Sequence, residues 1–326
     1  MLEELVLSKT ISLEECKAML PMFTKSLNDG TPAFFPRKDT GISYLSLWVP
    51  VEQNDWLYPV GTVNATIIRH TWKDKQEKEP NISGILQKLD GILSKYNLTQ
   101  PWLIHRMSFK SELDVTNASL YIKLLGRTDP SSLSKLGKGV KIYNTTGQLR
   151  GYEFSNGITK AVICYESGSK LSIRVTVRGR DGLKHITKDL FVRSRIPEDY
   201  VGKLQKVEDY FIKHTLNAIT GEGDYLSLSE AEKRIDMFMD ISHKECNKYM
   251  AVLEGIRRYR GMENFLRHMD DPESLPEEYG ILKKRTIAER MIKGLRKHGI
   301  NPLTIPIREE QAGIRMLPNL GKCRRT

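Results

Sequence analysis

One alternating segment constrains the fold of this chain more than any other. Apolar side chains occupy every second position of Leu171–Val177, which is the period of a β-strand with one buried face. Arg174 and Arg178 belong to the alternate, polar face, which is therefore either solvated or bound to an anionic partner. A second apolar run, Ala161–Tyr165, precedes this strand across the turn Glu166–Ser169. The two runs predict a β-hairpin and thus an antiparallel sheet.

Strands and helices are predicted on both sides of this hairpin. The predicted strands are Ser43–Val49, Val63–Trp72, Trp102–Phe109, Asn117–Leu125 and Val140–Asn144. The predicted helices are Ser12–Leu20, Ile82–Tyr96 and Glu198–Thr215, and the chain after Ser227 is almost wholly helical. We therefore predict an α+β fold, in which an antiparallel sheet with packed helices (residues 1–223) precedes a helical C-terminal region (residues 224–326).

The C-terminal segment Leu282–Ile307 is predicted to form a basic amphipathic helix with clear ends. Thr286 and Glu289 have the spacing of a capping box at its start. Gly299 can supply the left-handed residue that ends it. The apolar side chains that recur at steps of four along it are Ile287, Met291 and Leu295.

Cations crowd the other side of this helix and the residues before it. The candidate DNA-binding residues are Lys283, Lys284, Arg285, Arg290, Lys293, Arg296 and Lys297. A helix with an apolar back and a cationic front suits the major groove of DNA, and a solvated surface helix is the competing interpretation. Charge favours DNA, because the net charge is +11 and residues 276–326 hold 12 Lys or Arg against 5 Asp or Glu.

Composition and motifs exclude several other classes of protein. No apolar run approaches the roughly 18 residues that span a bilayer, and the N-terminal segment is too weakly apolar for a signal peptide. The four cysteines are scattered without a CxxC pair, which argues against a zinc finger or a redox motif. P-loop, GxGxxG, HExxH and GxSxG motifs are absent. We therefore expect a cytoplasmic protein that binds DNA and no membrane.

Tyr143 is the candidate nucleophile. It lies on a short predicted strand beside Lys141, before a turn that contains Gly147. A tyrosine hydroxyl can attack a DNA phosphodiester and keep the bond energy in a phosphotyrosine link for later rejoining. Lys141 or a metal ion would offset the charge that develops on the phosphate oxygens. Core or rim packing is the competing role for a tyrosine on a strand.

His70 and His105 are the candidate metal ligands. They lie on two predicted strands that one helix connects, so these strands are expected to lie side by side. Two imidazoles in that arrangement can share a divalent metal ion. The competing interpretation is that each histidine is an ordinary hydrogen-bonded side chain of the surface or the core.

The C-terminal segment resembles that of the gene II and gene X replication proteins of filamentous phages. The residues that carry this resemblance are Thr286, Arg290, Arg296, Gly299, Ile300 and Ile305. Three upstream segments agree in order with that family. VKIYNTTGQLRG is similar to its tyrosine segment, with Tyr143 at the tyrosine, while IHRMSF and LSIRVTVRGRDGL are similar to two of its strands.

The resemblance implies a rolling-circle initiator, which is a site-specific DNA endonuclease and ligase. Such an enzyme nicks one strand of a duplex origin through its tyrosine, leaves a 3′-OH for a host polymerase, and later rejoins the displaced strand. Tyr143 would be the nucleophile, and Arg174 and Arg178 would offset phosphate charge. The implied cofactor is Mg²⁺ or Mn²⁺. The implied partners are origin DNA, as duplex and as displaced single strand, and the host replication machinery.

The chain departs from the family pattern at three positions. Ser108 stands where the family has a strand aspartate, Ile173 lies near the place of a glutamate, and Thr145 replaces a lysine that follows the tyrosine. These departures suit a diverged active site. They also suit a DNA-binding replication regulator of the gene X type that does not cut DNA, and this second function stays open.

Overall fold

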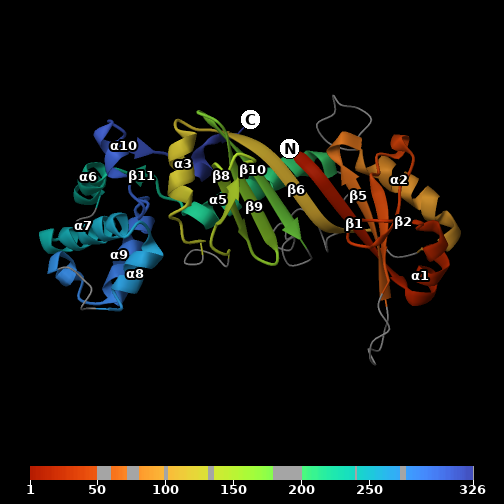
Figure 1. Ribbon diagram of the computed structural model, residues 1–326, viewed down its shortest axis with the longest axis horizontal. Helices are drawn as coiled ribbons and strands as arrows, with labels where there is room; N and C mark the ends of the chain where they lie inside the picture. The colour runs from red at the N-terminus through yellow and green to blue at the C-terminus, as the bar shows by residue number, and fades with distance from the viewer. Residues whose placement is uncertain are drawn as a thin grey trace. The chain divides into compact units, whose positions relative to one another are not determined.

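The chain has an α+β fold with a large antiparallel sheet and several helices, as predicted at this coarse level (Figure 1). The structure is a computed structural model that describes residues 1–49, 60–71, 81–98, 102–130, 136–178, 200–238, 241–271 and 277–325. It divides into two compact units. Unit 1 comprises Met1–Lys110, Gly157–Thr159 and Arg174–Phe211, and unit 2 comprises Ser111–Asn156, Lys160–Ile173 and Ile212–Thr326.

The sheet of unit 1 has the strand order β2-β3-β4-β5-β1-β6. Its strands are β1 (Leu2–Ser12), β2 (Lys25–Ser26), β3 (Pro32–Phe34), β4 (Tyr44–Trp48), β5 (Val60–Ile68) and β6 (Leu103–Asp114). Leu7 of β1, Ala65 of β5 and Leu45 of β4 lie side by side in the register, and all three are fully buried. The helices α1 (Leu13–Met19) and α2 (Ile82–Leu93) add further buried apolar side chains to this core.

The central strand β1 is not among the predicted elements. Glu3, Glu4 and Lys9 interrupt its apolar pattern. Lys9 is nevertheless buried, because its ammonium lies 5.0 Å from the centre of the Trp102 ring and 3.7 Å from a carboxylate oxygen of Asp90. The partners that make this charge tolerable are distant in sequence, so the alternation that marks a strand is obscured.

The sheet of unit 2 contains the predicted hairpin. The strand order in this part of the sheet is β10-β9-β8-β7, with β7 (Val140–Tyr143), β8 (Leu149–Ser155), β9 (Thr159–Ser167) and β10 (Lys170–Arg178). Residues 170–173 of β10 belong to unit 2, and the remainder of the strand belongs to unit 1. The alternation in β10 is confirmed, since Leu171, Ile173 and Val175 are fully buried. β8, which the sequence did not predict, pairs with both β7 and β9.

The prediction of a strand at Asn117–Leu125 is wrong, because this segment is the helix α3 (Ala118–Leu125). The Asn117 side chain caps it by accepting a hydrogen bond from the backbone N–H of Leu120 at 3.0 Å. Most side chains of α3 are buried, so its sequence lacks the polar face that marks a surface helix. A short run of apolar residues was therefore mistaken for a buried strand.

The helical character of the chain after residue 200 is confirmed. The helices are α5 (Tyr200–Thr220), α6 (Leu228–Phe238), α7 (His243–Arg258), α8 (Met262–His268), α9 (Arg285–Lys297) and α10 (Ile307–Gln311). The first part of α5 belongs to unit 1 and its remainder to unit 2. Among the helices that the structure describes, none is long and apolar enough to cross a membrane.

Two buried asparagines join the end of α5 to the C-terminal segment. Asn319 donates from Nδ2 to the carbonyl oxygen of Gly221 at 2.7 Å and to the hydroxyl of Thr220 at 3.0 Å. Asn301 donates from Nδ2 to the carbonyl oxygen of Thr220 at 2.7 Å. Pairing of β11 (Tyr225–Leu226) with β12 (Met316–Leu317) joins the same two parts of the chain. These contacts fix the place of the segments on either side of α9.

Candidate nucleic-acid interface

The predicted basic helix is α9, but its start differs from the prediction. Its N-cap is Lys284, no side chain caps it, and Thr286 lies in its exposed first turn. Glu289 accepts a hydrogen bond from Nε of Arg285 at 2.9 Å, so the predicted capping box is wrong. The C-terminal end of α9 agrees with the prediction, because Gly299 has a left-handed φ of 73°. The buried side chains of α9 are Ala288, Met291, Ile292 and Leu295.

Most of the candidate DNA-binding cations are exposed. Lys283, Lys284, Arg290, Lys293 and Lys297 are exposed, and Arg285 is exposed but ion-paired with Asp270 and Glu289. Lys293 and Lys297 follow Arg290 by three and seven positions, so the three cations lie along one side of α9. They are here called the basic arc. This arc can meet several phosphates of one DNA backbone.

Arg296 does not belong to the basic arc. Its side chain is half-buried, and Nη2 lies 3.4 Å from the sulfur of Met262 in α8. Burial lowers the pKa of the Arg296 guanidinium, and the carboxylate of Asp129 opposes that shift. This cation is therefore placed to act inside unit 2 and not on an exposed surface.

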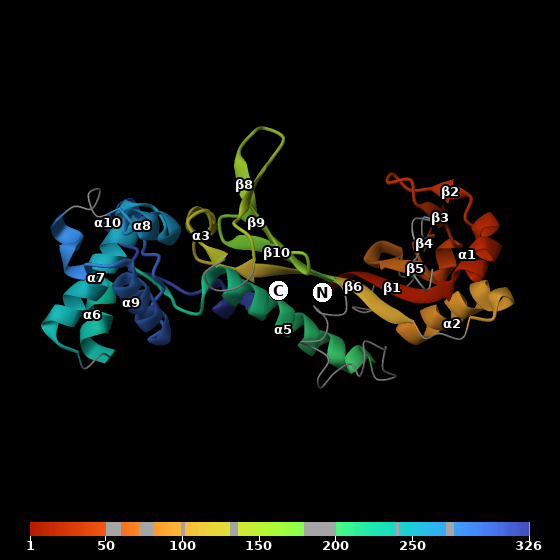
Figure 2. The same ribbon diagram turned by 90° about the horizontal axis from the view of Figure 1, so that it is seen from below.

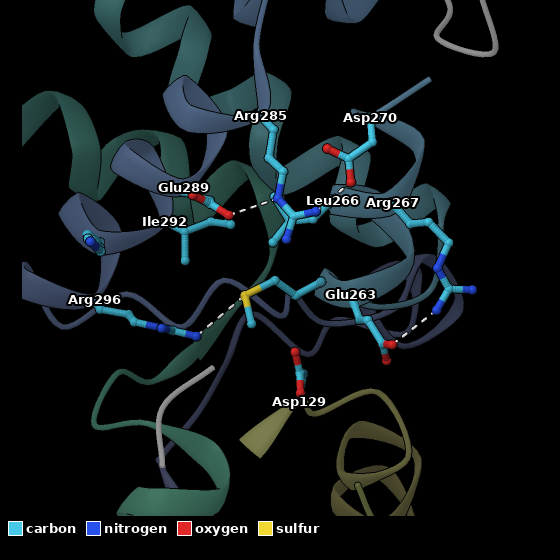
Figure 3. Close-up of a pocket in the computed structure, with 11 residues that line it drawn as sticks. Asp129, Glu263, Leu266, Arg267, Asp270, Arg285, Glu289, Ile292 and Arg296 are labelled. Atoms are coloured by element: carbon cyan, nitrogen blue, oxygen red, sulfur yellow. Dashed lines mark hydrogen bonds and ion pairs between the residues drawn. The ribbon is translucent and has the colours of Figure 1, made fainter. Parts of the chain in front are cut away.

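A pocket of about 530 Å³ lies beside Arg296 in unit 2. Figure 3 shows Arg285, Ile292 and Arg296 reaching toward it from α9, with Asp129 on its far side. Asp129 follows α3, so the pocket joins parts of unit 2 that are distant in sequence. This pocket was not predictable from the sequence, because its walls come from three separate segments.

Tyr143 lies at the end of β7, on a hairpin that projects from the sheet of unit 2 (Figure 2). Its side chain is 55% exposed, and Lys141, two residues earlier on the same face of β7, is also exposed. A tight turn follows, in which Oδ1 of Asn144 accepts from the backbone N–H of Gln148 at 2.8 Å and Gly147 has a φ of 78°. The turn holds Tyr143 and Lys141 at the surface together.

Tyr152 on β8 is the aromatic neighbour of Tyr143. It lies opposite Lys141 in the register of the hairpin and is buried. Burial raises the pKa of Tyr152, and the nearby Tyr143 hydroxyl adds to the rise. Tyr143 is thus the accessible hydroxyl of the pair, and Tyr152 is the buried one.

Arg174 and Arg178 lie in unit 1, whereas Tyr143 and Lys141 lie in unit 2. Nε of Arg174 lies 2.7 Å from a carboxylate oxygen of Glu3, so this cation is already neutralised. Arg178 is exposed at the end of β10. The predicted catalytic set is therefore divided between the two units.

The predicted neighbourhood of His70 and His105 is wrong. β1 lies between β5 and β6, so the strand that leads to His70 and the strand that holds His105 do not pair. His70 itself lies in a 3₁₀ turn (Arg69–Thr71). Among the described residues, no group of three or more His, Cys, Asp or Glu could hold a metal ion. The two histidines therefore do not lie on neighbouring strands where they could share a metal ion.

A polar network on unit 1 escaped the sequence analysis. Nη2 of Arg106 lies 2.7 Å from a carboxylate oxygen of Glu4, and the hydroxyls of Ser108 and Thr176 are 2.7 Å apart. Ser108 therefore lies among groups from β1, β6 and β10. The consecutive Glu3 and Glu4 would have signalled this network only if β1 had been recognised as the central strand.

Comparisons with known proteins do not assign the chain to a family. No protein-family model matches it, and no curated protein matches its sequence. Among solved structures, the di-domain ARO/CYC StfQ from the steffimycin biosynthetic pathway is similar over 66% of this chain and 96% of that chain, with 11% identity and a TM-score of 0.20. A likeness at that level carries no argument about fold or function.

Proposed function

We propose that this protein is a DNA-binding replication initiator of the rolling-circle type that nicks and rejoins DNA through Tyr143. The observation that carries the proposal is the exposed Tyr143 hydroxyl beside Lys141 on a projecting hairpin. The resemblance to the phage replication proteins supplies the reaction, and with it the initiator-like fold and a C-terminal DNA-binding region. DNA and the host replication machinery are the partners, in the cytoplasm of the host cell.

The chemistry follows from the position of the two side chains. The Tyr143 oxygen attacks a backbone phosphorus, its proton goes to solvent, and a bond forms between the tyrosine and the 5′ phosphate. The bond to the 3′ oxygen breaks, and that oxygen takes a proton from solvent to become a 3′-OH. Lys141 offsets the charge on the phosphate oxygens. Attack of a 3′-OH on the phosphotyrosine reverses the step and rejoins the strand.

The basic arc of α9 is the proposed contact to duplex DNA. Its three cations are exposed and spaced along one side of the helix. Phosphate contacts of this kind position a protein on DNA without specifying sequence. The arc therefore serves both the nicking function and a purely regulatory one.

The test is a denaturing gel of the intact protein with 3′-labelled oligonucleotides in Mg²⁺ or Mn²⁺. A covalent adduct is expected for the wild type and should be absent for Tyr143→Phe. Tyr165→Phe is the matched control, because Tyr165 is an exposed tyrosine on β9 of the same sheet. An undiminished adduct in Tyr143→Phe would remove Tyr143 from the mechanism.

A DNA-binding regulator of the gene X type is the second candidate. The observation that favours it is the pairing of Arg174 with Glu3, which occupies a cation that the nicking reaction was expected to use. Binding to DNA with neither nick nor adduct in either metal would support this candidate against the first.

A further inference from the structure

The pocket between α8 and α9 has the size of a ligand site, and its lining combines many charged side chains with a small apolar wall. Its volume of about 530 Å³ lies within the range of about 300–1,000 Å³ that is typical of small-molecule sites. Met262, Leu266 and Ile292 form an apolar wall, and each is less than a tenth exposed. Such a wall suits a flat, apolar group such as a nucleobase.

The charges around this wall are mostly paired with one another. Arg285 is paired with Glu289, and Nη2 of Arg267 lies 3.0 Å from a carboxylate oxygen of Glu263 (Figure 3). Lys293 differs, because it forms no ion pair or hydrogen bond with the residues that the structure describes. Its ammonium at the pocket is available to an anion such as a phosphate.

Lys293 belongs both to the pocket and to the basic arc. It lies between Arg290 and Lys297 on the exposed side of α9, and it also lines the pocket. A DNA strand whose phosphates follow the basic arc therefore passes the pocket at Lys293. Neither the nicking chemistry at Tyr143 nor simple phosphate binding requires a cavity at this position.

We propose that the pocket holds one nucleotide of the bound DNA strand, turned out of the base stack. The base packs against Met262, Leu266 and Ile292, and the phosphate contacts Lys293. The carboxylates of Asp129 and Glu263 line the same space and accept hydrogen bonds but do not donate them. This inference rests on the proposed DNA binding by α9 and not on nicking.

The test uses the intact protein and duplex oligonucleotides in which 2-aminopurine replaces one base of one strand at successive positions. Binding should raise the fluorescence at one position, because unstacking relieves quenching. Lys293→Gln should abolish that rise at saturating protein. Lys297→Gln is the matched control, since this lysine lies on the same helix outside the pocket, and it should weaken binding while keeping the rise. No rise in the wild type bound to DNA, or an equal rise in both variants, would overturn the proposal.

A titration with free deoxyadenosine monophosphate separates this inference from the proposed function. The wild type should bind the nucleotide, and Lys293→Gln should bind it about tenfold more weakly, or about 1.4 kcal/mol. Absence of binding to the wild type refutes the pocket proposal even if Tyr143 forms its adduct. Binding that Lys293→Gln weakens supports the pocket proposal even if no adduct forms.

Discussion

Replacing both Arg290 and Lys297 with Ala should reduce the slope of log K for DNA binding against log salt concentration by about two. Both cations are exposed on the basic arc, and neither forms an ion pair with the described residues. Each phosphate that a protein neutralises contributes about 0.9 to the slope of log K against log salt concentration, so two lost contacts remove about 1.8. Alanine is the strongest helix former, so α9 should keep its structure.

Arg296→Ala is the informative contrast on the same helix. Its guanidinium is half-buried against the sulfur of Met262, so its loss should leave the salt slope unchanged. It should instead lower the free energy of unfolding by about 1–3 kcal/mol, because packing around the buried stem is lost. Fluorescence anisotropy across a salt series measures the slope, and urea unfolding measures the stability. If Arg296→Ala lowered the slope by about 0.9, as the loss of one phosphate contact would, the division of α9 into an exposed arc and a buried cation would be refuted.

Three further predictions concern stability. Asn319→Ala should lower the free energy of unfolding in urea by about 3 kcal/mol, because the fully buried Asn319 side chain bonds to several groups of the turn after α5; a change within experimental error would contradict this role. Gly294→Ala should destabilise by about 1–3 kcal/mol, because its Cβ would overlap Oη of Tyr249; Tyr249→Phe in the same chain should restore only part of the loss, because Cε1 and Cζ of the ring stay 2.9 and 3.0 Å from that Cβ. Desolvation and the charges of Arg106 and Arg178 lower the pKa of His105, so the unfolded chain binds this proton more tightly and stability falls on acidification through the ordinary pKa of 6.5. His105→Gln should therefore flatten the stability profile below about pH 6.5, and an unchanged profile would show that another group titrates.

Local sequence patterns were sufficient to predict a helix or strand where one of its faces is exposed to solvent. The alternation of Leu171–Val177 predicted β10 correctly, because the buried and polar positions in that strand follow its period of two. The predicted start of the first helix at Ser12 is also correct, because the capping hydrogen bonds between Ser12 and Glu15 form within four residues. In such elements the residues that make the sequence pattern are also the residues that form the structure.

Elements whose character depends on distant partners were not predictable. β1 contains Lys9, whose burial depends on Trp102 and Asp90 from other segments. α3 was taken for a strand because neighbours such as Pro318, which accepts a hydrogen bond from Oη of Tyr121, cover most of its surface. The division of the α9 cations required the position of α8, and the insertion of β1 between β5 and β6 separated the two histidines. Site residues named from the sequence alone carry no information on such neighbours.

The interleaving of the two units along the chain bears on the order in which they form during synthesis. β13 (Arg324–Arg325) pairs with the end of β6 at Leu113 and Asp114, so this edge of unit 2 must wait for almost the entire described chain to leave the ribosome. Unit 1 likewise waits for the residues from Arg174 to Phe211. Pairings between such distant segments form slowly. The end of β6 therefore stays without this pairing partner until β13 has been made.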